Sequence, residues 1–175
     1  MADQVVGRPW PPPELVPADQ VAEAAEAAQA IAEASAQAMW KADLASQHLG
    51  MSLQQIGPGR AVLQMVVTAP MVNGHGLCHG GYIFTLADSA FAFACNTYGA
   101  KVVAASAGID FLSPARVGDT LVASAGERYR HGRSGLYYVT IRRAGDDSIV
   151  AEFRGRSRVI AAPTTRPSFT STDDA

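Results

Sequence analysis

The sequence predicts an α+β fold in which an antiparallel β-sheet wraps around one central buried helix, with a helical extension at the N-terminus. Three observations predict it. Residues 82–95 form an apolar run of helical length with one carboxylate, Asp88. Segments of alternating apolar and polar residues stand before and after this run, and residues 18–48 are rich in alanine. Alternation is typical of strands, whereas alanine favours helix.

The central helix is predicted over the apolar run because no proline interrupts it and its alanines and leucine favour helix. Apolar side chains fall on every side of the predicted helix, so we expect it to be buried nearly all round.

Six strands are expected around this helix. Two of them form a hairpin through Gly57-Pro58-Gly59, and four follow the helix, separated by turns rich in glycine. Their expected ranges are 51–56, 60–68, 101–111, 119–130, 136–143 and 149–160. An antiparallel sheet usually has one face that needs a cover, and a single helix between the second and third strands can provide it.

The chain divides into four parts. Residues 1–17 contain five prolines and predict a flexible, extended arm. Residues 18–49 predict a long helix, with a possible break expected near Ser35 or Ala42. Residues 50–162 form the main domain, and residues 163–175 predict a flexible tail.

Composition narrows the class of function. The net charge of −2 and the pI of about 6.0 give no sign of nucleic-acid binding. Two cysteines form no disulfide framework, which favours a cytoplasmic setting. The sequence contains no apolar run of the ~18 residues needed to span a bilayer and no signal-peptide layout at its start. We therefore expect a cytoplasmic protein with no nucleic-acid or membrane partner.

Two features of the central stretch carry chemistry. A carboxylate within an apolar helix costs several kcal/mol unless it has partners or a task, which singles out Asp88. Gly80 and Gly81 stand where the helix begins. A helix start offers unpaired N–H groups, and glycine lets a ligand approach them closely. The pair therefore suits a carbonyl oxygen that becomes negative during a reaction.

The stretch Asn73-Gly-His-Gly-Leu-Cys-His-Gly-Gly81, the following Leu86-Ala87-Asp88 and the later Ile109-Asp110-Phe111-Leu112 resemble the hotdog-fold acyl-CoA thioesterases of the phenylacetic-acid-degradation type. The resemblance covers roughly residues 40–160. It implies a hotdog fold and the hydrolysis of phenylacetyl-CoA, hydroxyphenylacetyl-CoA or another aryl or medium-chain acyl-CoA. It also implies that no cofactor is needed besides the CoA of the substrate, and that the protein is a homodimer, itself paired into a dimer of dimers.

The resemblance assigns roles to individual residues. Asp88 matches the acid that serves as nucleophile or general base, and Gly80 matches the glycine whose N–H polarises the thioester carbonyl. Asn73 is implied to hold the attacking water or the carboxylate, and His79 to orient the thioester. Ser106, on the strand after the helix, is implied to assist the acid. Gly81 is expected to contact the substrate.

The spacing of Gly80 and Asp88 constrains how a site could form. Eight residues along a helix span roughly 12 Å, whereas an attacking oxygen and an oxyanion donor must meet around one carbonyl. We therefore expect shared sites, with Gly80, Asn73 and His79 from one subunit and Asp88 and Ser106 from the other. A two-fold dimer contains two such sites.

Basic residues near residue 130 suit the phosphates of CoA. Arg128, Arg130 and Arg133, together with His131 and Ser134, lie around a predicted turn, and Arg116 is a weaker candidate. Arginine binds phosphate through paired N–H donors. The alternative is a solvated hairpin tip, since charged side chains usually face water.

Other interpretations of the motif stay open. His75, Cys78 and His79 have compact spacing, but no fourth ligand is evident, so no metal is expected. Asp88 could be a structural residue bonded to N–H groups. The chain could also be a non-catalytic acyl-CoA-binding module. A hydratase is disfavoured because no histidine lies between Gly80 and Asn96.

Overall fold

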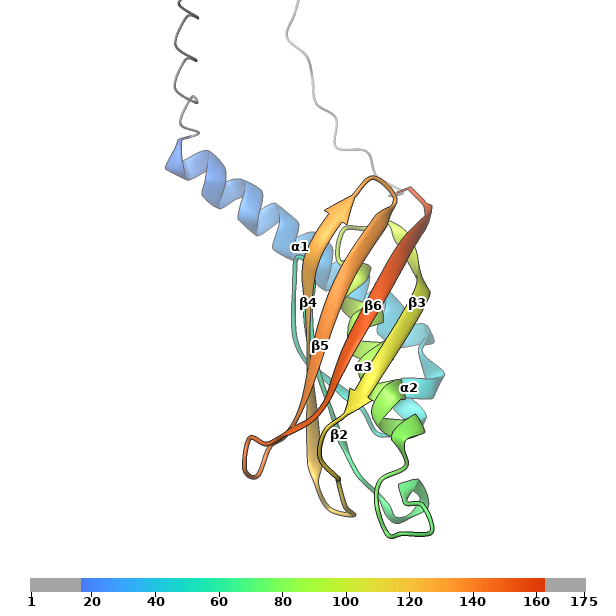
Figure 1. The fold of residues 1–175 in the computed structure, drawn as a ribbon. Coiled ribbons are helices and arrows are strands. Elements are labelled where there is room, and N and C mark those ends of the chain that lie inside the picture. The colour runs from blue at the N-terminus through green and yellow to red at the C-terminus, as the bar shows by residue number, and fades with distance from the viewer. Residues whose placement is uncertain (1–16, 163–175) are drawn as a thin grey trace, which may run out of the picture.

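A computed structural model describes residues 17–162, so most of the predicted arm at 1–17 and the whole predicted tail at 163–175 lie outside the described residues. A curved sheet packs around one helix, with a second long helix behind it (Figure 1). The helical elements are α1 (Ala18–Ala42), α2 (Leu44–His48), the short 3₁₀ turn η1 (Ala69–Met71) and α3 (Gly80–Cys95). The strands are β1 (Ser52–Gly57), β2 (Arg60–Val66), β3 (Lys101–Phe111), β4 (Thr120–His131), β5 (Ser134–Arg143) and β6 (Ile149–Ala161).

The six strands found between residues 17 and 162 belong to one antiparallel sheet, in the order β1-β2-β4-β5-β6-β3. The prediction of six antiparallel strands, with the helix between the second and third, is confirmed. β1 and β2 form the expected hairpin, and Gly59 has a positive φ of 70° in its turn. Glycine adopts such a backbone conformation at little cost.

The core lies between α3 and the inner face of the sheet. Leu86, Ala90 and Phe91 of α3 are fully buried against sheet residues such as Tyr137 and Phe153. One correction concerns the helix surface. The positions Gly81, Thr85, Asp88 and Ala92, spaced as on one helix face, are only partly covered or exposed. α3 is therefore not buried all round within a single chain.

The C-terminal half of α1 packs against the domain. Ala32 and Ala36 are buried, and the Trp40 ring lies 5.9 Å from that of Phe93, centroid to centroid. Near the N-terminus of the helix, Val21 is exposed. The expected break falls at Asp43, next to Ala42, where the carboxylate accepts hydrogen bonds from the Ser46 N–H (3.0 Å) and hydroxyl (2.6 Å). This cap starts α2 in a new direction.

β3 forms one border of the sheet. It pairs with β6 on one side, and within residues 17–162 no strand pairs with its other side. Most of its side chains are exposed. A register shift between Ala104 and Ser106 reverses the alternation of its side chains part-way along the strand.

Within residues 17–162, every helix is too short or too polar to cross a lipid bilayer.

Candidate active site

The N-terminus of α3 presents one open backbone donor. His79 caps the helix, and its Nδ1 accepts the Gly81 N–H at 3.1 Å. Two backbone bonds hold the approach to this turn, from Cys78 N–H to Ala115 O and from His79 N–H to Met71 O, both 2.8 Å. In the described part of the chain, the Gly80 N–H has no acceptor. Of the two glycines, Gly80 is therefore the one able to bind a ligand oxygen.

This arrangement corrects the expected role of Gly81. We expected its backbone to contact the substrate, but its N–H already donates to the imidazole of His79. The physical reason is that a helix N-cap side chain satisfies a donor two residues further on. His79 lies at the mouth of the helix as expected, and its own role includes this cap.

Asn73 organises the loop that precedes α3. Its Oδ1 accepts the N–H groups of His75 (2.9 Å) and Leu77 (3.3 Å), and its backbone N–H donates to Leu77 O (2.8 Å). The side-chain oxygen is thus used within the loop. Its amide nitrogen, which has no acceptor among the described residues, is the atom left to contact a ligand.

Asp88 lies half-buried on the partly open side of α3. Burial raises the pKa of its carboxyl group. No hydrogen bond or ion pair to this carboxylate occurs within residues 17–162. A structural aspartate would have N–H partners to offset the cost of desolvation, so the structural interpretation lacks support. A carboxylate with a raised pKa and no partner is typical of a reactive group.

The two cysteines are poor alternatives as nucleophiles. Both thiols are buried. Burial raises the pKa of Cys95 to about 12, and burial together with the Asp119 charge raises the pKa of Cys78. Because the thiolate is the reactive form, neither cysteine is activated.

Gly80 and Asp88 lie on the same helix, two turns apart. With a rise of about 1.5 Å per residue, their separation along the axis is roughly 12 Å. A single chain therefore does not bring the open N–H and the carboxylate to one carbonyl group.

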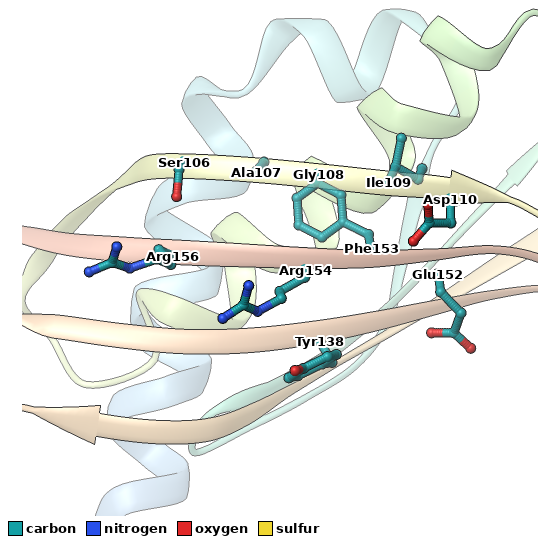
Figure 2. Close-up of a pocket in the computed structure, with 10 residues that line it drawn as sticks. All are labelled: Ser106, Ala107, Gly108, Ile109, Asp110, Tyr138, Glu152, Phe153, Arg154 and Arg156. Carbon is teal, nitrogen blue, oxygen red and sulfur yellow. The ribbon is translucent and has the colours of Figure 1, made fainter.

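Ser106 is the clearest disagreement with the sequence-based expectation. It pairs with Arg156, while its neighbours Ala107 and Ile109 pair with Gly155 and the buried Phe153. Side chains alternate along a strand, so Ser106 lies on the outer face of the sheet, beside the β6 arginines (Figure 2). α3 and Asp88 lie on the inner face. The register shift after Ala104 causes the difference, because plain alternation would have turned Ser106 inward.

The arginines expected to form one cluster are separated. Arg128 lies over the ring of Tyr138 on the outer face, at 5.4 Å from its centroid. Arg130 lies 3.8 Å above the ring of Tyr98 and 3.4 Å from a carboxylate oxygen of Glu127. A register shift between Glu127 and Tyr129 interrupts the alternation here.

The remaining predicted residues lie at the tip of the β4–β5 hairpin. Both Nε and Nη2 of Arg133 donate to Val159 O, at 3.1 and 2.8 Å, and Ser134 pairs with His131. Tyr98, which follows the C-terminus of α3, is covered by Arg130 from the same hairpin. These residues therefore lie at the end of α3 opposite Gly80. Arg116 is in the loop before β4, where its N–H donates to Asp119.

A hollow of about 460 Å³ adjoins Gly80 and includes Asn73, Ile83, Phe111 and Leu112 in its wall. The ring of Phe111 comes so close that a Cβ on Gly80 would lie 2.8 Å from it. Phe111 and Leu112 are each more than half exposed. No role for Phe111 was predicted from the sequence. Its position as the final residue of a strand, followed by Pro114, was the available signal.

The His75, Cys78 and His79 side chains do not gather as metal ligands would in the described part of the chain. Cys78 is buried, whereas Nδ1 of His79 is occupied by the Gly81 N–H. Within residues 17–162, no three histidine, cysteine or acidic side chains gather as metal ligands would.

Comparison with known proteins places these features. Residues 75–150 match the model of the thioesterase superfamily. The acyl-coenzyme A thioesterase PaaI of Escherichia coli K12 is 44% identical over 131 residues, which are 75% of this chain and 93% of that protein. The chain belongs to the thioesterase superfamily.

Solved structures of the superfamily agree with the fold. The E. coli PaaI structure, from the phenylacetic acid degradation operon, matches with a TM-score of 0.75 and 42% identity, covering 77% of this chain and 97% of that one. A mutant of the phenylacetic acid degradation protein PaaI from Thermus thermophilus matches with a TM-score of 0.63 and 35% identity, covering 66% of this chain and 97% of that one. The predicted hotdog fold and family are confirmed.

Proposed function

We propose that this chain hydrolyses acyl-CoA thioesters to a free acid and CoA, with phenylacetyl-CoA, hydroxyphenylacetyl-CoA or another aryl or medium-chain acyl-CoA as substrate. Membership of the thioesterase superfamily supports the reaction class, and similarity to the PaaI protein of the phenylacetic acid degradation operon supports the aryl group. The observation that carries the site is the half-buried Asp88, which has no partner within the described chain and a raised pKa.

The thioester carbonyl oxygen accepts the open N–H of Gly80 at the start of α3. This donor and the partial positive charge of the helix stabilise the negative oxygen that develops as the carbonyl carbon is attacked. The amide of Asn73 and the imidazole of His79 hold the thioester at the mouth of the helix. Phe111 and Leu112 line the adjoining hollow, which accepts the acyl group.

Asp88 acts by one of two routes. As a general base it takes a proton from water while the water oxygen attacks the carbonyl carbon. As a nucleophile its oxygen attacks directly and forms a mixed anhydride, which water then hydrolyses. On either route the C–S bond breaks and the CoA thiolate departs. Because thiolate is a good leaving group, no strong acid and no cofactor are required.

Two copies complete the site. Among the described strands, β3 has a free border, and the partly open side of α3 carries Asp88. Pairing of two β3 borders about a two-fold axis brings the α3 helices of the two copies together. Gly80, Asn73 and His79 of one copy then face Asp88 of the other, and two equivalent sites form. We further propose that two such dimers associate.

The same two-fold pairing supports a place for the nucleotide of CoA. Antiparallel β3 strands bring the start of one next to the end of the other, so the hairpin tip of one copy lies on the side of its partner's Gly80. We propose that Arg130, Arg133 and Ser134 contact the phosphates there. Arg128, on the outer face, is the least suited of the predicted residues. We place the enzyme in the cytoplasm, where its two free thiols stay reduced.

Mixing two inactive variants tests the shared site. Asp88→Ala and Asn73→Ala are each expected to lose most activity. After they are unfolded and refolded together, half of the dimers are mixed, and each has one intact site. About a quarter of wild-type activity should therefore be recovered, because half of the dimers are mixed and half of the sites in each mixed dimer are intact. No recovery, with mixed dimers verified by differently tagged chains, would show that the site lies within one chain.

The alternative function, a non-catalytic acyl-CoA-binding module, predicts binding of CoA esters without release of thiol. Wild-type protein is given a panel of CoA esters, including phenylacetyl-CoA and straight-chain esters, and free thiol is measured. Turnover that depends on Asp88 supports the enzyme. Tight binding of the esters without thiol release would instead establish the binding module.

A further inference from the structure

The outer face of the sheet carries a hollow that the proposed reaction does not use. It has a volume of about 530 Å³ and is formed by β3, β6 and β5. Ser106 and Gly108 line it from β3, Arg154 and Arg156 from β6, and Tyr138 from β5 (Figure 2). The sheet itself separates this hollow from α3 and Asp88, so the two places are distinct.

Several polar groups in the hollow have no protein partner. Neither Arg154 nor Arg156 forms an ion pair or a side-chain hydrogen bond within the described part of the chain. The hydroxyl groups of Ser106 and Tyr138 are likewise without a bonded partner among residues 17–162. Two guanidinium groups and two hydroxyl groups thus converge on one space. Such convergence is a mark of a binding site.

The strand pairing explains why the guanidinium groups are accessible. Arg156 lies opposite Ser106 and Arg154 opposite Gly108, so each arginine has only a small residue beside it on β3. A Cβ placed on Gly108 would meet nothing within 4 Å. The surface of β3 beside the two arginines therefore carries no bulky side chain and is open to a ligand.

The two ends of the hollow differ in charge. The next pair along the strands is Asp110 and Glu152, and Glu152 already accepts a hydrogen bond from the Thr140 hydroxyl at 3.0 Å. The arginine end favours an anion, whereas the carboxylate end favours hydroxyl or amine donors. A ligand that fits both ends is a phosphate ester whose organic part carries such donors.

We propose that this outer-face hollow binds a phosphate-bearing ligand, with Arg154 and Arg156 on the phosphate and Ser106 and Tyr138 donating to its remaining oxygens. Paired N–H donors of arginine match phosphate oxygens. This assigns Ser106, which faces away from Asp88, to a second site. Two sources of the phosphate are distinguishable, inorganic diphosphate and a nucleoside diphosphate, since only the latter reaches Asp110 and Glu152.

Calorimetric titration of the full-length protein with inorganic diphosphate and, separately, with ADP tests the proposal. We expect binding of at least one probe, weakened about tenfold or more in Arg154→Gln/Arg156→Gln, on the scale of two lost charge-assisted contacts. Arg116→Gln/Arg142→Gln, which removes the same net charge elsewhere, is expected to change affinity less than about threefold. Asp110→Asn should weaken the binding of ADP, whose nucleoside reaches Asp110, and leave the binding of diphosphate almost unchanged.

Thioester hydrolysis serves as the second readout. Because the hollow is on the other face of the sheet, the KM for the CoA ester should be unchanged in Arg154→Gln/Arg156→Gln. An increase in that KM would assign these arginines to the nucleotide end of the substrate and overturn a separate site. Absence of binding by either probe to the wild type at millimolar concentration, or equal losses in both double variants, would also overturn it.

Discussion

At the scale of single residues, Asp88 combines three properties that rarely occur together. It is central in a helix, half-buried, and without a bonded partner in the described chain. Desolvation disfavours its charged form and raises its pKa. A carboxylate in this state accepts a proton more readily than one on the surface, which suits a base that acts near neutral pH.

Asp88→Asn keeps the size of the side chain and removes its ability to ionise. We expect kcat to fall by more than about a hundredfold, the scale of a lost acid–base group, with little change in KM. In the wild type, activity should fall as the pH drops through the pKa of Asp88, which burial raises from its ordinary value. Steady-state rates across pH 4–9 check both points. A near-normal rate in the variant would contradict the assignment.

The same variant has a predicted effect on stability. Because the folded-state pKa of Asp88 is raised above its unfolded value, the folded state binds the proton more tightly. The charged carboxylate therefore destabilises the fold at neutral pH, and the penalty disappears as the pH falls below the unfolded pKa. Asp88→Asn should have a higher Tm than the wild type at pH 7.5, and this advantage should shrink towards pH 4. Thermal unfolding at several pH values measures it, and a lower Tm at pH 7.5 would contradict it.

At the residue scale, two positions could be predicted from the sequence, because each depends on one helix alone. Asp88 is the lone carboxylate of the apolar run, and Gly80 is the residue at which α3 begins. The availability of a backbone N–H could not be predicted, because a neighbouring side chain determines it. The N–H of Gly81 is taken by His79, and no sequence pattern distinguished Gly81 from Gly80.

At the scale of elements, the composition of α1 determines that it is helical, whereas packing determines which part of it contacts the domain. Its alanines make it helical along its whole length, while only its later part contacts the domain. Trp40 anchors that part against Phe93 of α3, and the Gln29 amide donates to Ile56 O of β1 at 3.0 Å.

Trp40→Ala should destabilise the protein by about 2 kcal/mol, less than for a fully buried tryptophan because Trp40 is partly exposed. Val21→Ala, on the exposed part of the same helix, should change the free energy of unfolding by no more than about 0.5 kcal/mol. Urea unfolding of both variants makes the comparison. Equal effects would mean that α1 is held along its length by contacts other than Trp40.

Strand positions were predicted within a few residues, because alternation and turn residues mark them. Which side chains of β3 and β4 lie on which face of the sheet was not predicted. A register shift after Ala104 in β3 moves Ser106 to the outer face. One after Glu127 in β4 pairs Arg130 with the buried Gly135, so Arg130 no longer shares the outer face with Arg128. A shift of one residue reverses a strand's faces, and cross-strand pairing decides it rather than the strand's own residues.

At the scale of the whole molecule, the proposed site depends on association. Specific activity should therefore fall when the enzyme is diluted below the dissociation constant of the dimer, in parallel with the fraction of dimer. Activity and sedimentation measured over the same concentration series check this. A monomer that keeps full specific activity would contradict it.

The two borders of the sheet differ in a way that governs how large an assembly can grow. The β1 border is short, irregular at Leu53/Gln55 and partly occupied by the Gln29 amide, whereas the β3 border is long and uncovered by any other described residue. A sheet with one edge available for strand pairing can pair with only one other copy through that edge, about a two-fold axis. Such joining closes on itself, which protects a protein rich in strands from the endless edge-to-edge stacking that forms fibres.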